Sequence, residues 1–395
     1  MRRQSLPVLA LAALLLPGSI RAEETARKPT FEIYGFAQVD YIQDFKRMPS
    51  DWDATLRPSR IPTTDEGDGQ AIFSARQSRL GVRGSIPVGD SDLFGRVEFD
   101  FFGRGTGQPD SAGQNTLRLR QAYGSWGPIL GGLTASLFMD DDLWPNIVDY
   151  WGPCGMAFYR NVQIRYTFLT GTHTLAIAVE RPGADLQNYP NVPALQDLAS
   201  DNKIPDFTAQ YRLSQAWGYV QASGILRRLG YDTGAGGIKG SKFGWGLNGS
   251  STIKILPDRL KLLVAVVGGA GIENYMNDAT PDLAIDGTFT APTAAAVPML
   301  GLTGYVDISW TKVLTTAIGY STVFIFNTSL QPNSALKRGQ YASVNLLVSP
   351  FRNFLAGPEF LWGRRNDLGG AYGDDFRLQV SLKYSFSSLD FWKPS

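Results

Sequence analysis

From Phe376 to Phe386 the chain reads FRLQVSLKYSF. Apolar or aromatic residues stand at every second position, and Arg, Gln, Ser, Lys and Ser stand between them. One face of this segment is therefore apolar and the other polar, which is the period of two expected of a β-strand. The same alternation recurs at 96–101, 162–168, 175–180, 207–213, 243–255 and 342–348. The repeated pattern predicts an all-β protein.

The connections between the alternating segments differ in length in a regular way. Sixteen strands are predicted, near 30–43, 71–86, 92–103, 115–127, 129–139, 160–169, 172–181, 205–214, 217–229, 241–255, 258–268, 302–312, 313–325, 339–349, 352–365 and 374–386. Short connections such as Gly127-Pro128 and Leu256-Pro257 alternate with long ones such as 44–70 and 269–301. This asymmetry is typical of outer-membrane barrels, whose sheet must close because open strand edges are not tolerated in lipid. We therefore predict a 16-stranded antiparallel transmembrane β-barrel with short periplasmic turns and long extracellular loops; a secreted β-sandwich would leave the asymmetry unexplained.

The amino terminus has the features of an export signal. Met1-Arg2-Arg3 supplies positive charge, Leu6 to Leu16 form a short apolar core, and Ala22 offers a small residue for cleavage. An apolar run of about ten residues is too short to span a bilayer. We predict a cleaved signal peptide over 1–22 and an outer-membrane barrel over 23–395, in the outer membrane of a Gram-negative bacterium.

The composition argues against several other classes of protein. The 37 Lys and Arg nearly balance the 36 Asp and Glu, so no strong basic field predicts nucleic-acid binding. Cys154 and His173 are the single cysteine and the single histidine, too few for a disulfide or a transition-metal site. His173 also lies in a predicted tight turn, where it could not serve a Ser–His hydrolase. We expect no enzyme activity, no cofactor and no metal.

The polar face of each strand should line a channel if its apolar face meets lipid. Outward Leu80 and Val82 turn Arg79 and Arg83 inward, and the same reasoning applies along the other strands. The predicted pore-lining basic residues are Arg79, Arg83, Arg96, Arg118, Arg120, Arg165, Arg365 and Arg377, and the acidic ones are Glu98, Asp100 and Glu359. A row of guanidinium groups favours anions. The alternative is that these arginines only pair with neighbouring carboxylates and keep the wall hydrated.

The long connection 140–159 is rich in both acidic and aromatic residues. Its carboxylates are Asp140, Asp141, Asp142 and Asp149. Folded into the lumen, it would narrow the channel and set acids opposite the arginines of the second to fourth strands. Two alternatives are an ordinary solvated extracellular loop and a calcium site at Asp140 to Asp142. We favour a constriction loop over 140–159.

Aromatic residues near the predicted strand ends match the girdles that flank the lipid-facing band of such barrels. They are Trp126, Trp217, Tyr219, Trp245, Trp310, Tyr320, Trp362 and Tyr384. Because any β-protein carries some aromatics, this feature supports the barrel without deciding it.

Several stretches resemble the DcaP-like outer-membrane porins. They are 75–82 (ARQSRLGV), 97–101 (VEFDF), 117–123 (LRLRQAY), 136–140 (SLFMD), 160–167 (RNVQIRYT), 204–206 (IPD), 217–221 (WGYVQ), 226–228 (LRR), 359–366 (EFLWGRRN) and the last strand from Arg377. The resemblance implies a trimeric 16-stranded channel for small carboxylates, dicarboxylates among them. This chain departs from the usual aromatic end of such barrels, because nine residues follow Phe386.

Together these features predict a porin for passive diffusion of small hydrophilic solutes, biased to anions such as (di)carboxylates. The expected partners are small anionic solutes, outer-membrane lipid and lipopolysaccharide, and two further copies of the chain. A general or phosphate-type porin with weak selectivity is one alternative. A non-transport surface protein, such as an adhesin or receptor, is the other.

Overall fold

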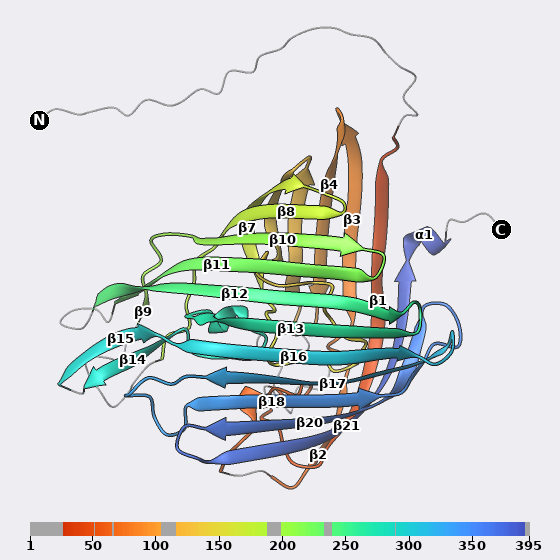
Figure 1. The fold of residues 1–395 in the computed structure, drawn as a ribbon. Coiled ribbons are helices and arrows are strands. Elements are labelled where there is room, and N and C mark those ends of the chain that lie inside the picture. Colours follow the sequence, from red (N-terminus) through yellow and green to blue (C-terminus); the bar gives the residue numbers. More distant parts are fainter. Residues whose placement is uncertain are drawn as a thin grey trace, which may run out of the picture.

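The computed structural model describes residues 27–50, 52–64, 67–103, 116–187, 199–232, 239–288 and 290–391. The predicted signal peptide over 1–22 lies outside these residues. In the described part the chain is mostly β-strand, with the four-residue α1 (Ser388–Phe391) after the last strand (Figure 1). No helix in these ranges is long and apolar enough to cross a membrane.

Sixteen long strands form one closed antiparallel sheet. They are β1 (Thr30–Asp44), β3 (Arg79–Val88), β4 (Ser91–Asp100), β5 (Arg118–Trp126), β6 (Ile129–Ala135), β7 (Arg160–Leu169), β8 (His173–Glu180), β10 (Asp206–Gln215), β11 (Gly218–Asp232), β12 (Lys239–Leu256), β13 (Leu260–Ala270), β16 (Pro298–Ser309), β17 (Leu314–Ile325), β18 (Leu336–Asn345), β20 (Phe354–Asp367) and β21 (Tyr372–Ser387). Each pairs with the next along the chain, and β1 closes the sheet on β21, with Tyr34 opposite Ser387. The predicted 16-stranded barrel is confirmed.

Five shorter strands complete the β-structure of the described residues. β2 (Gln70–Ser74), β9 (Ala199–Ser200) and β19 (Leu347–Val348) lie next in sequence to β3, β10 and β18. β14 (Leu283–Thr288) and β15 (Ala291–Ala296) form a separate hairpin inside the long connection 271–297. The predicted strands do not include this hairpin, because its alanine-rich second strand shows no alternation.

The wall has an apolar outside and a polar inside. On β3, Leu80 and Val82 are exposed, whereas Glu98 of the neighbouring β4 is only 1% exposed. On β21, Leu382 is exposed and Gln379 is buried. This arrangement reverses that of a soluble protein and suits a sheet whose outer face meets hydrocarbon.

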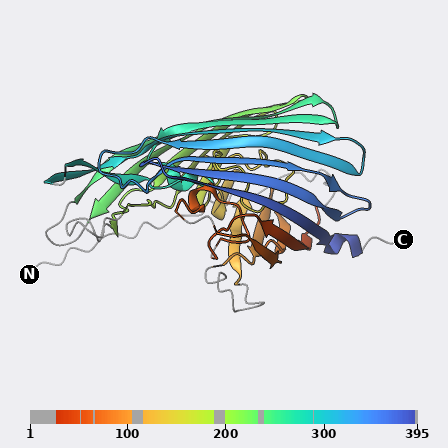
Figure 2. The same cartoon turned by 90° about the horizontal axis from the view of Figure 1, so that it is seen from below.

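The two ends of the barrel differ as expected. Two to five residues join most strand pairs at the end where β1 begins and β21 ends, as in the turns 89–90, 127–128 and 349–353. We call this the short-turn end, and the opposite one the long-loop end. Figures 1 and 2 show the green-to-blue strands as one broad wall, with orange and yellow strands across from it and loop segments between them.

The largest apolar cluster lies inside the barrel, not between two sheets. Phe138, Met139 and Met156 of the segment 136–159 pack with residues of the inner wall such as Val267 and Tyr341. We call the segment 136–159 the inner loop.

Candidate functional site

The inner loop crosses the lumen from one wall to the other. Near its start, the carboxylate of Asp140 accepts hydrogen bonds from Tyr219 (2.8 Å) and Ser250 (2.7 Å) on β11 and β12. Near its middle, the carbonyl of Val148 accepts hydrogen bonds from the side-chain amides of Gln77 (2.8 Å) and Gln379 (2.9 Å). These contacts hold the loop to opposite parts of the barrel.

The end of the inner loop lies flush against a third part of the wall. The backbone N–H of Gly155 donates to Ser321 Oγ at 2.8 Å. A Cβ at position 155 would stand 2.2 Å from the carbonyl oxygen of Thr322 and 2.7 Å from that of Leu302. Only glycine allows the loop backbone to approach β16 and β17 so closely.

Replacing Gly155 by alanine is therefore expected to push the inner loop off the wall. We expect a loss of about 1–3 kcal/mol in stability, as for other insertions into packed interiors, and noisier single-channel currents. Thermal unfolding of the detergent-solubilised protein measures the first effect. Gly249→Ala is the matched control, because a Cβ there meets nothing within 4 Å. Equal midpoints for the two variants would show that position 155 has room.

On the wall opposite β16 and β17, two carboxylates hold four arginines. Glu98 on β4 lies 2.6 Å from Arg96, 3.2 Å from Arg120 and 3.5 Å from Arg79, measured between carboxylate oxygens and guanidinium nitrogens. Its side chain is 1% exposed. A single negative charge therefore serves three guanidinium groups on three neighbouring strands.

Asp100, two residues further along β4, has the same role. It lies 2.6 Å from both Arg118 and Arg120. Tyr150 of the inner loop joins this group, because its hydroxyl is 2.9 Å from Asp100 and 2.6 Å from Arg120. The tip of the inner loop is thus bonded to the arginine wall.

A β-bulge places Arg120. Glu98 pairs with Gln121 and Phe99 with Leu119, so Arg120 is the extra residue of β5. A bulge re-aims a side chain locally. As a result, Arg120 and Gln121 both line the lumen although they are consecutive.

Two further cations face the lumen without a carboxylate within ion-pair distance among the described residues. Arg160, the first residue of β7, lies over the ring of Phe158 at 5.0 Å. Lys383 on β21 lies over Phe36 at 4.0 Å. Cation–π contacts of this kind leave the N–H donors available to other partners.

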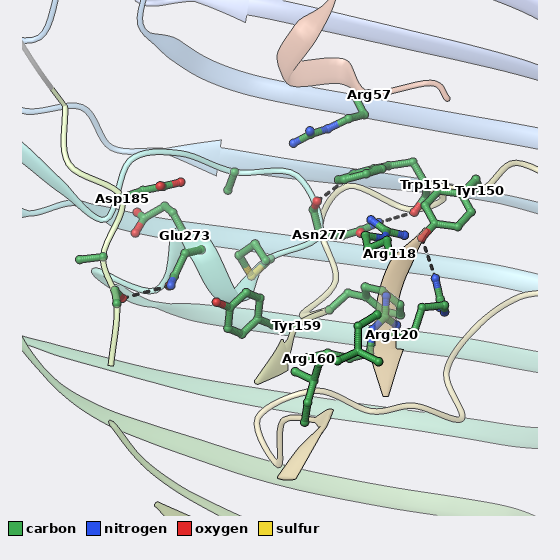
Figure 3. A pocket seen from close by; sticks show the side chains of 18 residues that line it. Arg57, Arg118, Arg120, Tyr150, Trp151, Tyr159, Arg160, Asp185, Glu273 and Asn277 are labelled. Atoms are coloured by element: carbon green, nitrogen blue, oxygen red, sulfur yellow. Dashed lines mark hydrogen bonds between the residues drawn. The ribbon is translucent and has the colours of Figure 1, made fainter. Parts of the chain in front are cut away.

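Two chambers meet at the inner loop. The long-loop chamber has a volume of about 540 Å³ and the short-turn chamber about 410 Å³. Both are lined by Arg120, Tyr150, Phe158 and Arg160. Figure 3 shows the long-loop chamber, with Arg118, Arg120 and Arg160 grouped near Tyr150. We call the four residues that line both chambers, Arg120, Tyr150, Phe158 and Arg160, the boundary.

The remaining predicted basic residues lie away from the two chambers. Arg83 binds Glu32 at the short-turn rim (2.6 Å), and Arg165 donates to the carbonyl of Ala135. Neither lines either chamber. Their nearest partners are wall atoms.

Arg365 and Arg377 instead hold the long loop 45–69. Arg365 binds Asp367 and donates to the carbonyl of Ser59 at 2.8 Å. Arg377 is fully buried and makes a bidentate pair with Asp44 (2.6 and 3.0 Å). Glu359, predicted as an acidic lining residue, has a comparable place, since it accepts the backbone N–H of Val148 in the inner loop.

The acids of the inner loop do not all face the arginine wall. Asp142 binds Arg212 on β10 at 2.6 Å, and Asp140 lies 3.9 Å from the same guanidinium. Asp149 is buried and accepts a hydrogen bond from Tyr341 at 3.1 Å. Two of the four predicted loop acids, Asp141 and Asp149, line the short-turn chamber, which also contains Arg120 and Arg160.

Burial raises the pKa of Asp140 and Asp149 above that of an ordinary aspartate, because desolvation penalises the charged form. Hydrogen bonds offset part of this effect, from Ser250 to Asp140 and from Gly152 to Asp149. These carboxyls therefore hold the loop in place. Among the described residues no group of three or more His, Cys, Asp or Glu is arranged to hold a metal ion.

A scan of protein families matches residues 20–386 to the DcaP outer membrane protein family. The chain belongs to this family. It is accordingly an outer-membrane channel of the porin class, not an enzyme.

Solved structures of a DcaP channel and of other porins share its fold. The DcaP channel of Acinetobacter baumannii is 22% identical, with a TM-score of 0.80 over 91% of this chain and 98% of that one. An anion-selective porin from Comamonas acidovorans is 10% identical, with a TM-score of 0.58 over 91% and 100%. OmpT of Vibrio cholerae is 12% identical, with a TM-score of 0.53 over 92% and 99%. A search of curated protein sequences returns no match.

Two arginines that line the chambers of this DcaP-family channel, Arg57 and Arg160, are not among the predicted basic residues. The position of Arg160 could have been predicted from the sequence, because this residue begins a strand directly after the aromatic end of the inner loop. The position of Arg57 could not. Arg57 lies between the rings of Trp52 (4.2 Å) and Trp151 (3.9 Å) and binds Asp278 at 3.0 Å, and both Trp151 and Asp278 come from distant loops.

Proposed function

We propose that the channel allows passive diffusion of small hydrophilic anions, in particular carboxylates and dicarboxylates. The surplus of cations on the wall around the boundary carries the proposal. Glu98 and Asp100 are shared by four arginines, and Arg160 and Lys383 have no carboxylate partner among the described residues. An anion passing between the chambers therefore meets a positive wall.

The arrangement also suits passage instead of tight retention. Guanidinium binds carboxylate by two parallel hydrogen bonds. Here most of these groups are already occupied by wall carboxylates, so an entering solute competes for them and binds weakly. Conduction requires sites that attract a solute yet release it. Two anionic groups on one solute could contact two arginines at once, which favours dicarboxylates over monocarboxylates.

Arg160→Gln tests the contribution of the cation that lacks a carboxylate partner. Removing one charge at the boundary is expected to lower the chloride-to-potassium permeability ratio about threefold at 0.1 M salt. The ratio follows from the reversal potential in planar bilayers. Arg352→Gln, which removes an exposed charge paired with Asp390 on the short-turn side, is the matched control. A ratio unaffected by Arg160→Gln would remove that residue from the proposed path.

A second readout addresses the dicarboxylate preference. Succinate added to one side should reduce the chloride current of the wild-type channel more than acetate at equal concentration. Equal effects of the two acids would leave the anion bias in place and end the dicarboxylate part of the proposal.

Export and assembly belong to the same proposal. A cleaved signal peptide over 1–22 would deliver the chain to the periplasm, and the apolar outer face offers surface for two further copies, for lipid and for lipopolysaccharide. A homotrimer agrees with the resemblance described above.

A further inference from the structure

The long-loop chamber has an acidic side as well as a basic one. Asp185 and Glu273 line it at one end, and Arg118, Arg120 and Arg160 line it at the other (Figure 3). Asp185 follows β8, and Glu273 belongs to a short 3-10 turn after β13. The two acids thus come from two long loops that meet over the arginine wall.

In the described part of the chain, the cation that neighbours the acidic side, Arg227, is engaged by other groups. The nearby guanidinium of Arg227 is fully buried and binds Asp206 (3.0 Å), Asp282 (3.2 Å) and Asn274 (2.7 Å). It also donates to two backbone carbonyls, those of Gly271 and Gly183. Each of its three nitrogens therefore donates to a group other than Asp185 and Glu273.

Glu273 is left with an unpaired oxygen. Its side chain is completely buried, Oε2 accepts the backbone N–H of Ile272 at 2.8 Å, and Oε1 has no hydrogen-bond partner. A buried carboxylate oxygen without a donor is unfavourable. Burial also raises the pKa of Glu273 well above its usual range, and the neighbouring Asp282 adds to the effect. A cation that entered the chamber would supply the missing partner of Glu273 Oε1 and would stabilise the charged form of this carboxyl group.

Asp185 offers a second, more accessible carboxylate. Its backbone N–H donates to Asp282 at 2.7 Å, which fixes the residue at the chamber wall. No donor in the described part of the chain reaches its carboxylate, and the side chain is exposed. The acidic side therefore combines one exposed and one buried carboxyl group.

We propose that the long-loop chamber is a binding site for small aminocarboxylates, with the carboxylate on Arg118, Arg120 and Arg160 and the ammonium group toward Asp185 and Glu273. This inference rests on the proposed function, because the same arginines attract the anionic end. A solute with opposite charges at its two ends matches both sides of the chamber. A plain dicarboxylate places a negative group beside negative groups at one end.

Two monoanions of similar size, aspartate and succinamate, distinguish a solute that carries an ammonium group from one that does not. Aspartate carries an ammonium group and two carboxylates, whereas succinamate carries a neutral amide and one carboxylate. Swelling of proteoliposomes containing the full chain reports how fast each enters. At low ionic strength, aspartate should enter about threefold faster than succinamate, the size of a modest ion-pair preference.

Asp185→Asn with Glu273→Gln should bring the aspartate-to-succinamate ratio close to one, since both acids are then neutral. Asp185→Asn alone, at an exposed position, should lower the ratio without threatening folding. Asp258→Asn is the matched control, an exposed turn aspartate with a positive φ that asparagine also tolerates. A ratio of one in the wild type, or an unchanged ratio in folded Asp185→Asn and the double variant, would overturn the inference.

The failure of this inference can be told apart from that of the proposed function. A wild-type channel that prefers chloride to potassium but treats aspartate and succinamate alike contradicts only the aminocarboxylate site. A channel without chloride preference contradicts the proposed function itself.

Discussion

Replacing Arg118 and Arg120 together by glutamine is expected to remove most of the anion preference of the channel. Asp100 would lose both of its guanidinium partners, and Glu98 would keep only Arg79 and Arg96. At a few ångströms from the solute path, two charges in a partly screened medium should change the chloride-to-potassium permeability ratio about tenfold. The reversal potential across a salt gradient measures this ratio.

Two exposed arginines provide the control for that double variant. Arg47→Gln with Arg352→Gln removes the same total charge, from residues that pair with Asp68 and Asp390 outside the chambers. We expect a much smaller shift in the permeability ratio for this pair. Similar shifts for both double variants would mean that overall charge, not the arginine wall, sets the selectivity.

Deleting residues 140–149 is expected to raise the single-channel conductance about twofold or more, because ions then pass a wider cross-section. The deleted stretch includes Val148, whose carbonyl reaches Gln77 and Gln379 across the lumen. Conductance in symmetrical salt is the measurement. Retained heat-modifiable migration in electrophoresis shows that the shortened barrel still folds.

A milder variant distinguishes an effect on the width of the lumen from an effect on the folding of the barrel. Gln77→Ala with Gln379→Ala leaves the inner loop complete but removes both donors to the Val148 carbonyl. This variant should show larger current fluctuations around an almost normal mean. Wild-type conductance in the deletion variant would refute the proposed constriction.

The fold was accessible from sequence because side-chain alternation is a local property. Most strand boundaries moved by four residues or fewer, whereas the strand predicted over 71–86 is divided into β2 and β3. The inward placement of Arg118 follows from outward Leu119. The bulge at Arg120 was not accessible, since a register shift depends on the partner strand. The same limit explains why Arg120 and Gln121 were not predicted to face the lumen together.

The alternation pattern could not predict the environment of residues that contact distant loops. Tyr219 was placed in an aromatic girdle, which is wrong, because it is buried and donates to Asp140 of the inner loop. Arg377 was expected in an open wall, yet the loop 45–69 covers it through the carbonyl of Asp53. In both cases the alternation along the strand indicates which side of the wall the side chain faces. The loop that covers it decides whether the side chain is exposed to water.

The central claim is that the wall formed by β3, β4 and β5 gives the lumen a net positive field. The reversal potential of the purified wild-type channel, measured across a tenfold gradient of potassium chloride, tests it most directly. We expect a potential with the sign of chloride selectivity that shrinks as salt concentration rises. A potential of zero, or one with the sign of potassium selectivity, would contradict it.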